Sequence, residues 1–276
     1  MTFDLHCHSH YSDGQHAPEL VMQRAVTNGV THLAFTDHDV LAADADVPLP
    51  YPLRIVPGVE ISTLHEGREI HVVGLGLRSS DPELRELLSS QQAARWQRLQ
   101  AMDRLLTQAR LPGLADRVAD LPTLAPSRTH VADFLVSLGV CKDRSRAFQT
   151  HLGRQGRFYV KPQWCSMQMA IKTIQAAGGL AVLAHPHRYA STMSGLRRLV
   201  GEFSELGGDA MEVACANIDP GTLDRLANSC TQMGLLASCG SDFHSQSATW
   251  MDVGRLPELP QQCKKNAIWL AAGWHL

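Results

Sequence analysis

The sequence predicts an α/β fold built on a mostly parallel sheet, open or closed into a barrel, with a helical insertion. Strand-like and helix-like segments alternate near both ends of the chain, which favours parallel strands joined by helices. A middle region has helical spacing and almost no strand signal. The length of 276 residues, with 44% hydrophobic and 19% charged residues, allows a sizeable core in a soluble globular protein.

The alternating segments form an N-terminal and a C-terminal group. The first group ends in a hairpin, because the turn His65-Glu66-Gly67 precedes another apolar segment. Its expected elements are strands at 3–5, 32–35, 54–59 and 69–77 and a helix at 17–28. The second group follows Gly178-Gly179, and its expected elements are strands at 180–184, 210–213 and 235–238 and helices at 194–206 and 220–233.

The middle region is the predicted insertion. Leucines at helical spacing indicate a long helix at 82–110. Shorter helices are expected at 127–138 and 143–152, and 158–160 is the one strand candidate. We therefore divide the chain into an α/β body formed by 1–81 and 166–276 and a helical insertion at 82–165.

Charge is distributed unevenly over these parts. The whole chain has a net charge of −2, but residues 82–172 carry about +7 and the remainder about −9. This balance excludes a generally cationic nucleic-acid coat protein. An acidic body beside a basic insertion instead suits metal cations in the body and a phosphate-bearing substrate near the insertion. A solvated helix surface does not easily explain five cations that lie on predicted short helices and loops: Arg144, Arg146, Arg154, Arg157 and Lys161.

Composition also bears on location. No stretch reaches the roughly 18 apolar residues of a membrane helix, and we expect neither a signal peptide nor a membrane partner. The 7 cysteines include no Cys-x-x-Cys pair, so buried free thiols in a reducing cytoplasm are expected. The sequence indicates no obligate protein partner.

Histidine and carboxylate side chains follow the predicted strands. His6 and His8 come directly after the first strand, and in an extended chain residues i and i+2 point to the same side. The carboxyl ends of strands are where α/β barrels and open α/β sheets place their sites. The candidate metal ligands at these positions are His6, His8, Asp13, His38, Glu60, His71, His185, Asp242 and His244.

The donor types narrow the chemistry. Imidazole and carboxylate without thiolate suit Mn, Fe or Zn, with Mn favoured. The candidate groups are too many for one ion and suffice for two or three, with Glu60 as a bridge. Clustered cations can convert a bridging water into hydroxide and neutralise phosphoryl oxygens, which is the chemistry of phosphate-ester hydrolysis. Isolated histidines are expected to be structural: His10, His16, His32, His65, His151 and His275.

The order of these motifs resembles the PHP (polymerase and histidinol phosphatase) superfamily. The matching segments are His6-x-His8-Ser9, Thr36-Asp37-His38-Asp39, Gly58-Val59-Glu60, His71, His185-Pro186 and Ser241-Asp242-x-His244. The resemblance implies a distorted (β/α)7 barrel with a trinuclear metal site. It assigns the first metal to His6, His8, Glu60 and Asp242, the second to Glu60, His71 and His185, and the third to Asp13, His38 and His244.

Further segments resemble the bacterial RNase AM and 3′,5′-nucleotide bisphosphate phosphatase branch. They are Ile70-His71-Val72-Val73-Gly74-Leu75, Arg128-x-His130, Tyr159-Val160-x-Pro162-Gln163-Trp164-Cys165 and Ala184-His185-Pro186-x-Arg188-Tyr189. This branch removes the 3′-phosphate of nucleoside 3′,5′-bisphosphates and trims short 5′-phosphorylated RNA in the 5′→3′ direction. The alternatives are a histidinol-phosphate or other small phosphomonoester phosphatase, and a non-catalytic metal-binding accessory module.

Two departures from the family pattern stand out. The segment 40–55 is shorter than the barrel helix usually found there, and prolines interrupt it. His187 stands where the branch has Gly, and we expect it not to be a ligand.

The substrate anchors are expected on the insertion. Ser127 is expected near a helix N-terminus, which favours anions, and arginine supplies a bidentate fork for phosphate. Tyr159 or Trp164 could stack a base, and Asp37 is expected to orient His38. The candidate phosphate-binding residues are Ser127, Arg128, His130, Arg157 and Lys161.

Overall fold

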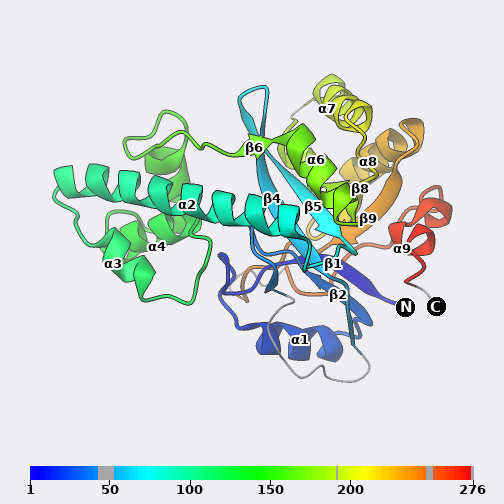
Figure 1. Ribbon diagram of the computed structural model, residues 1–276, viewed down its shortest axis with the longest axis horizontal. Helices are drawn as coiled ribbons and strands as arrows, with labels where there is room; N and C mark the ends of the chain where they lie inside the picture. Colours follow the sequence, from blue (N-terminus) through cyan, green and yellow to red (C-terminus); the bar gives the residue numbers. More distant parts are fainter. Residues whose placement is uncertain (43–52, 191, 247–250, 275–276) are drawn as a thin grey trace.

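The computed structural model describes residues 1–42, 53–190, 192–246 and 251–274, and it divides into a strand-rich body and a helical part extending to one side (Figure 1). The strands are β1 Phe3–Cys7, β2 His32–Phe35, β3 Arg54–Ile55, β4 Gly58–His65, β5 Arg68–Leu75, β6 Cys165–Ser166, β7 Leu180–Leu183, β8 Ala210–Cys215 and β9 Leu236–Gly240. The α-helices are α1 Pro18–Thr27, α2 Pro82–Gln108, α3 Leu114–Ala119, α4 Arg128–Ser137, α5 Arg144–Ala147, α6 Met167–Ala176, α7 Met193–Glu205, α8 Pro220–Gln232 and α9 Ile268–Ala271.

The strands form two sheets. One has the order β1-β2-β3 and the other β6-β4-β5-β7-β8-β9. All pairs are parallel except those of β5, which runs antiparallel to β4 and to β7. The expected hairpin is confirmed: Glu66 and Gly67 have φ values of 47° and 71° and form the tight turn between β4 and β5.

The two sheets meet at two seams. An isolated bridge joins His38, beyond the end of β2, to Glu60 in β4. A second bridge joins Cys7 in β1 to Phe243, beyond β9, and the Asp242 amide donates to the His6 carbonyl at 2.8 Å. Regular pairing is interrupted at both seams, and the arrangement is consistent with the expected distorted barrel.

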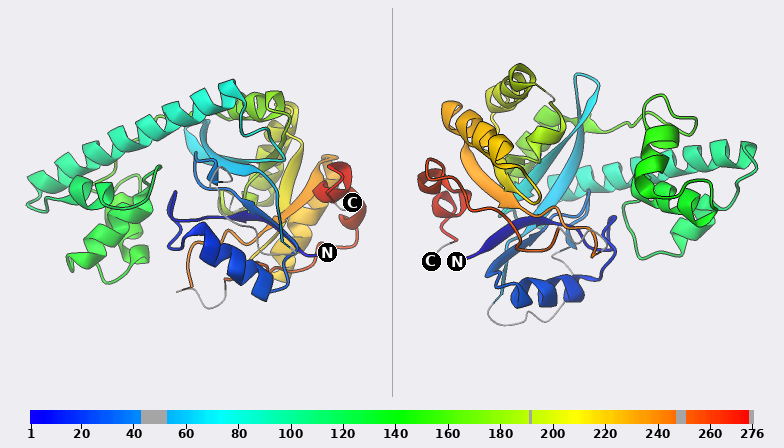
Figure 2. Two further views of the ribbon diagram at one scale, coloured as in Figure 1. Left: turned by 60° about the horizontal axis from the view of Figure 1, so that its bottom comes forward. Right: turned by 180° about the vertical axis from the view of Figure 1, so that it is seen from behind.

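Helices cover the outer face of the larger sheet. α6 packs on β4, β5 and β7, and α8 packs on β8 and β9 (Figure 2). Their apolar faces enter the main core, which includes Ile171, Ile174, Leu226 and Ala227. None of the described helices is both long and apolar enough to span a membrane.

The helical part has its own core. Leu84 and Leu88, in the first turns of α2, are buried in the main core of the body. Further along the same helix, Leu99 and Met102 belong to a second core that includes Phe158. Helix α2 therefore connects the body to a separately packed group of helices.

Several expected elements differ from the structure. The single strand expected at 54–59 is wrong: β3 ends at Ile55 and β4 begins at Gly58 in the other sheet, because Pro57 cannot donate a ladder hydrogen bond. The strand expected at 158–160 is also wrong, since Phe158 is instead a buried residue of the second core. Helices α3 and α6 were not predicted. The segment 43–52, which covers most of the stretch where a shortened barrel helix is expected, lies outside the described residues, as does His275.

Candidate metal centre

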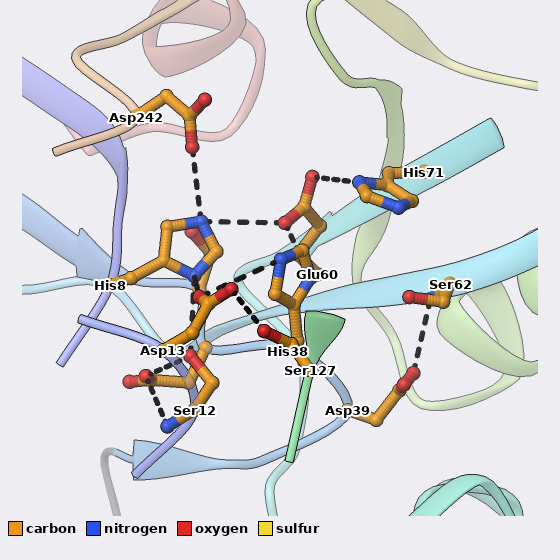
Figure 3. A network of polar contacts seen from close by, with 12 residues as sticks. His8, Ser12, Asp13, His38, Asp39, Glu60, Ser62, His71, Ser127 and Asp242 are labelled. Atoms are coloured by element: carbon orange, nitrogen blue, oxygen red, sulfur yellow. Dashed lines mark hydrogen bonds and ion pairs between the residues drawn. The ribbon is translucent and has the colours of Figure 1, made fainter. Parts of the chain in front are cut away.

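Glu60 lies at the centre of the candidate site. It is fully buried on β4, and its Oε1 is 3.0 Å from both His71 Nδ1 and His185 Nε2. Its Oε2 is 2.9 Å from His38 Nδ1. Figure 3 shows the Glu60 carboxylate between His8 on one side and His71 on the other. One carboxylate therefore faces imidazoles that come from four separate segments of the chain.

His6, His8 and Asp242 form a compact group beside Glu60. The His6 and His8 Nε2 atoms are 3.1 Å apart, and His8 Nε2 is 3.1 Å from Asp242 Oδ1. The same two nitrogens are 3.5 and 3.4 Å from Glu60 Oε2. These contacts bring together the residues expected to hold the first metal.

Asp13 lies close to three imidazoles, including that of His244. Its Oδ1 is 3.2 Å from His244 Nε2, 3.8 Å from His38 Nε2 and 3.9 Å from His8 Nδ1. The structure thus brings all the sequence-predicted ligands into one cluster, although the groups overlap: His8 adjoins both the first and third expected sets, and His38 lies between Glu60 and Asp13.

Sharp turns of the backbone at the ends of strands position these side chains. Asp39, His185 and Asp242 have positive φ values of 54°, 30° and 52°, so the chain turns sharply as it leaves β2, β7 and β9. Gly240 permits a close approach of β9 to β1, because a Cβ there would lie 2.2 Å from that of His6. The ends of the strands are thereby drawn together around one point.

Buried atoms without hydrogen-bond partners test whether this site fits metal ions. Among the described residues, Glu60 Oε2, Asp13 Oδ1, His38 Nδ1 and His185 Nδ1 are buried and make no well-aligned hydrogen bond, although His38 Nδ1 lies 2.9 Å from Glu60 Oε2 and His244 Nε2 lies 3.2 Å from Asp13 Oδ1. An unsatisfied buried carboxylate oxygen is costly unless a cation faces it. Three overlapping groups have donor atoms within 4.8 Å of one another: His8, Asp13, His38 and His244; His6, His8 and Glu60; and His38, Glu60 and His71. The donor set fits divalent ions.

The neighbouring groups in the cluster shift the pKa values of its carboxylates and imidazoles. Burial opposes ionisation of Glu60, but His38, His71 and His6 outweigh it and hold the pKa of Glu60 well below its usual range. Burial also opposes the charging of His71, yet Glu60 and Glu69 raise the pKa of His71 to about 10. For His8, burial and the neighbouring His244 lower the pKa to about 3. The carboxylates therefore remain ionised and available as ligands.

Glu212 is a site residue that sequence reasoning missed. It lies on β8, and its Oε1 is 2.6 Å from His6 Nδ1, whereas the other ring nitrogen of His6, Nε2, faces the cluster. Its Oε2 accepts from the His185 amide at 2.6 Å. Such outer partners fix the tautomer and orientation of ligating histidines. The signal was available, because Glu212 interrupts an otherwise apolar strand.

Asp37 does not contact the His38 ring, and its expected role is wrong. Its carboxylate accepts from the Ser9 hydroxyl at 2.8 Å and the Ser12 hydroxyl at 2.6 Å. Asp37 therefore holds the loop that carries Asp13, because Ser9 and Ser12 lie on that loop. The sequence could not show this, since both serines follow β1 and Asp37 follows β2.

A buried polar network ties α2 to the site. Asp39 accepts from Arg95 Nε at 2.6 Å and from the Ser62 amide at 3.0 Å. Arg95 also donates to the Ser62 hydroxyl at 2.6 Å, and Gln91 donates to the Ser62 carbonyl at 2.6 Å. These contacts fix the insertion against β4 near Glu60.

A cavity of about 310 Å³ opens over the candidate metal ligands and extends to the insertion. Its lining includes four arginines, Arg95, Arg98, Arg128 and Arg188. Arg188 forms an ion pair with Asp242, and Arg98 Nη2 is buried without a hydrogen-bond partner among the described residues. Sequence reasoning did not select Arg98 or Arg188 as anchors. The cavity therefore has acidic and imidazole groups at its floor and cations in its walls.

The residues expected to bind phosphate lie in different places in the structure. Ser127 and Arg128 line the cavity, and Ser127 donates to Asp13 Oδ2 at 2.8 Å. His130 accepts from the Ser127 amide in a capping box at the start of α4. Arg157 lies over the Phe158 ring, and Lys161 lines a neighbouring groove.

The structure also shows where the aromatic residues expected to stack a base and the isolated histidines lie. Trp164 is buried on the cavity wall, with the Arg95 guanidinium 4.9 Å from its ring centroid, whereas Tyr159 lines the neighbouring groove. His187 lines a different pocket. His187 and the described histidines expected to be structural are absent from the three candidate groups, as are the predicted ligands His185 and Asp242, so the non-ligand roles stay predictions: His10, His16, His32, His65 and His151.

The fold and the cluster agree with comparisons to known proteins. A model of the PHP domain matches residues 4–99, and the chain belongs to the PHP domain family. It is 42% identical to the 5′-3′ exoribonuclease Rnm of Escherichia coli strain K12, over 94% of this chain and 90% of that protein. It is 37% identical to a 3′,5′-nucleoside bisphosphate phosphatase of Chromobacterium violaceum, over 96% and 94% of the two chains.

A solved structure shares the whole architecture. It is an amidohydrolase from Chromobacterium violaceum that contains bound sulfate and no metal. The TM-score is 0.87 at 35% sequence identity, covering 99% of this chain and 96% of that chain. The similarity therefore includes the insertion as well as the body.

Proposed function

We propose that this protein is a metal-dependent phosphoesterase that removes the 3′-phosphate of nucleoside 3′,5′-bisphosphates and hydrolyses short 5′-phosphorylated RNA from its 5′ end. The observation that carries the proposal is the cavity that has the Glu60 cluster at its floor and arginines in its walls. The relatives named exoribonuclease and bisphosphate phosphatase support the same pair of substrates. Both reactions break a phosphate ester at a 3′ oxygen.

The metal-binding residues proposed are the nine predicted from the sequence. When bound, two or three divalent ions, with Mn favoured, would activate water and neutralise phosphoryl charge. Glu60 would bridge ions, because both of its oxygens face imidazoles. Glu212 and Asp37 would keep His6 and the Asp13 loop in place.

The arginines are proposed to bind phosphate. Arg188 has guanidinium donors beyond the one directed at Asp242, so it can also contact the phosphoryl group over the metal ligands. Arg128, on the insertion, is proposed to hold the 5′-phosphate. The insertion at 82–165 would then act as the substrate-binding cap. The free cysteines fit the cytoplasmic location that we propose.

A substrate panel tests the function. Purified protein with Mn would be assayed against 3′,5′-bisphosphoadenosine, histidinol phosphate and a 5′-phosphorylated oligoribonucleotide. We expect hydrolysis of the first and third substrates. Preferential hydrolysis of histidinol phosphate would support the small-phosphomonoesterase alternative, and no metal-dependent hydrolysis would support an accessory module.

Replacing Arg128 tests the phosphate anchor. Because Arg128 is proposed to contact only the 5′-phosphate, Arg128→Ala should raise KM about tenfold or more for 5′-phosphorylated substrates. The matched substrate is adenosine 3′-phosphate, which lacks that group. An equal loss on both substrates would remove the role assigned to Arg128.

A further inference from the structure

A second groove adjoins the metal cavity. It has a volume of about 680 Å³ and shares Glu69, Arg128 and Tyr189 with the cavity lining. One side is the tip of the β4–β5 hairpin, including Arg68, and the other is the segment before β6, including Arg154. The groove therefore continues the cavity outward between the body and the insertion.

The groove carries positive charge that is not compensated locally. Arg68, Arg154 and Lys161 line it and are exposed. Within the described part of the chain, no carboxylate lies at ion-pair distance from any of the three, and Arg154 donates to the Gly67 carbonyl at 2.5 Å. The groove's own carboxylate, Glu69, already accepts from Arg128 at 3.2 Å and from the Trp164 indole at 2.9 Å.

Tyr189 fixes where the groove meets the cavity. The His71 amide donates to the Tyr189 hydroxyl at 2.9 Å, and the Tyr189 ring centroid is 5.3 Å from that of His185. The junction thus lies beside two proposed metal ligands. A chain leaving a phosphate held over those ligands would pass directly into the groove.

We propose that this groove binds the sugar-phosphate backbone of RNA on the 3′ side of the scissile phosphate. Arg68, Arg154 and Lys161 would neutralise successive phosphates, and the half-buried Tyr159 would offer a ring beside them. The inference rests on the proposed function and deepens it. A nucleoside bisphosphate ends at the scissile phosphate and does not reach the groove, so the groove distinguishes RNA from the mononucleotide.

The test compares two substrates in a charge-reduced variant. Arg68→Gln/Arg154→Gln should lower kcat/KM for a 5′-phosphorylated pentaribonucleotide about tenfold. Hydrolysis of 3′,5′-bisphosphoadenosine should stay within about twofold, because that substrate makes no groove contact. The slope of log kcat/KM against log salt for the pentaribonucleotide should become shallower by about 1.4, since about 0.7 is lost per single-strand phosphate contact.

The control variant removes the same charge elsewhere. Arg104→Gln/Arg197→Gln changes two exposed arginines, on α2 and α7, that line neither the groove nor the cavity. It should leave both substrates unaffected. Equal losses on both substrates in the groove variant, or wild-type activity of that variant on the pentaribonucleotide, would overturn the inference.

A binding measurement separates this inference from the proposed function. Fluorescence anisotropy with chelator-treated protein would follow a 3′-labelled, 5′-phosphorylated pentaribonucleotide competed by unlabelled 3′,5′-bisphosphoadenosine. If wild-type protein hydrolyses neither substrate but binds the pentaribonucleotide more tightly than the groove variant does, the proposed function fails and the groove assignment holds. Identical affinities would refute the groove assignment.

Discussion

Glu60 illustrates how single residues depend on partners distant in sequence. A fully buried carboxylate is costly, and here imidazoles from β1, β5 and the segments after β2 and β7 offset that cost. Its Oε2 makes no well-aligned hydrogen bond within the described ranges, although His38 Nδ1 lies 2.9 Å away. This geometry fits the role of cation ligand that we propose for Glu60.

His8 provides the direct test of the cluster. His8→Ala should reduce turnover roughly a hundredfold or more, because a proposed ligand that belongs to two candidate groups is lost. The measurement is kcat with Mn, together with metal analysis and circular dichroism to check folding. His10→Ala, on the same loop but outside the described metal groups, is the matched control. Wild-type activity of His8→Ala would contradict the assignment.

Glu212 can be tested through metal affinity. Glu212→Gln removes the negative charge behind His6 and should weaken Mn binding by about 10- to 100-fold. Excess Mn should restore activity, because no proposed ligand has been removed. Titration calorimetry measures the affinity, with the exposed Glu205→Gln as control. An unchanged affinity would show that Glu212 does not support His6.

At the scale of elements, the strand ends and α2 position the site together. The predicted strands place their polar residues at the correct edge, but β4 and β5 form an antiparallel hairpin within the otherwise parallel order. His71 consequently enters from β5 beside Glu60. Helix α2 then joins this edge to the insertion through Arg95 and Asp39.

We expect the buried Arg95–Asp39 pair to contribute more to the free energy of unfolding than a more exposed ion pair does. Asp39→Asn leaves a 4%-exposed Arg95 without a counter-ion and should lower the free energy of unfolding by about 3 kcal/mol or more. Asparagine tolerates the positive φ of position 39, so backbone strain is not added.

The partly exposed pair between Arg144 and Asp133 supplies the comparison. Asp133→Asn should cost less than about 1 kcal/mol, because solvent screens that pair. Urea denaturation of metal-free protein measures both variants. Equal effects would mean that the α2 network does not stabilise the fold.

At the scale of the molecule, the packing of the insertion against the body and an uneven charge distribution define the surface proposed to bind substrate. The acidic body contains the candidate metal ligands, and the basic insertion contributes cations to the cavity wall. The insertion packs around its own core, yet α2 is buried in both cores. Cavity and groove lie where these two parts meet.

Metal loading should stabilise the whole molecule. Mn at about 100 times its dissociation constant adds about 2.7 kcal/mol, which raises Tm by about 5–10 °C for a chain of this size. Differential scanning calorimetry with and without chelator measures the shift. His8→Ala should show a smaller increase, and an identical increase in that variant would place metal binding elsewhere.

The sequence by itself determined the α/β class, the insertion, the candidate metal ligands that the structure brings together, and the separation of charge. Strand periodicity and polar residues after strands are local patterns, so they are readable without coordinates. Only the tertiary structure decided that Glu212 supports His6, that Asp37 holds the Asp13 loop, and which arginines line the cavity. These contacts join segments far apart in the chain, and their geometry depends on how the strands and helices pack.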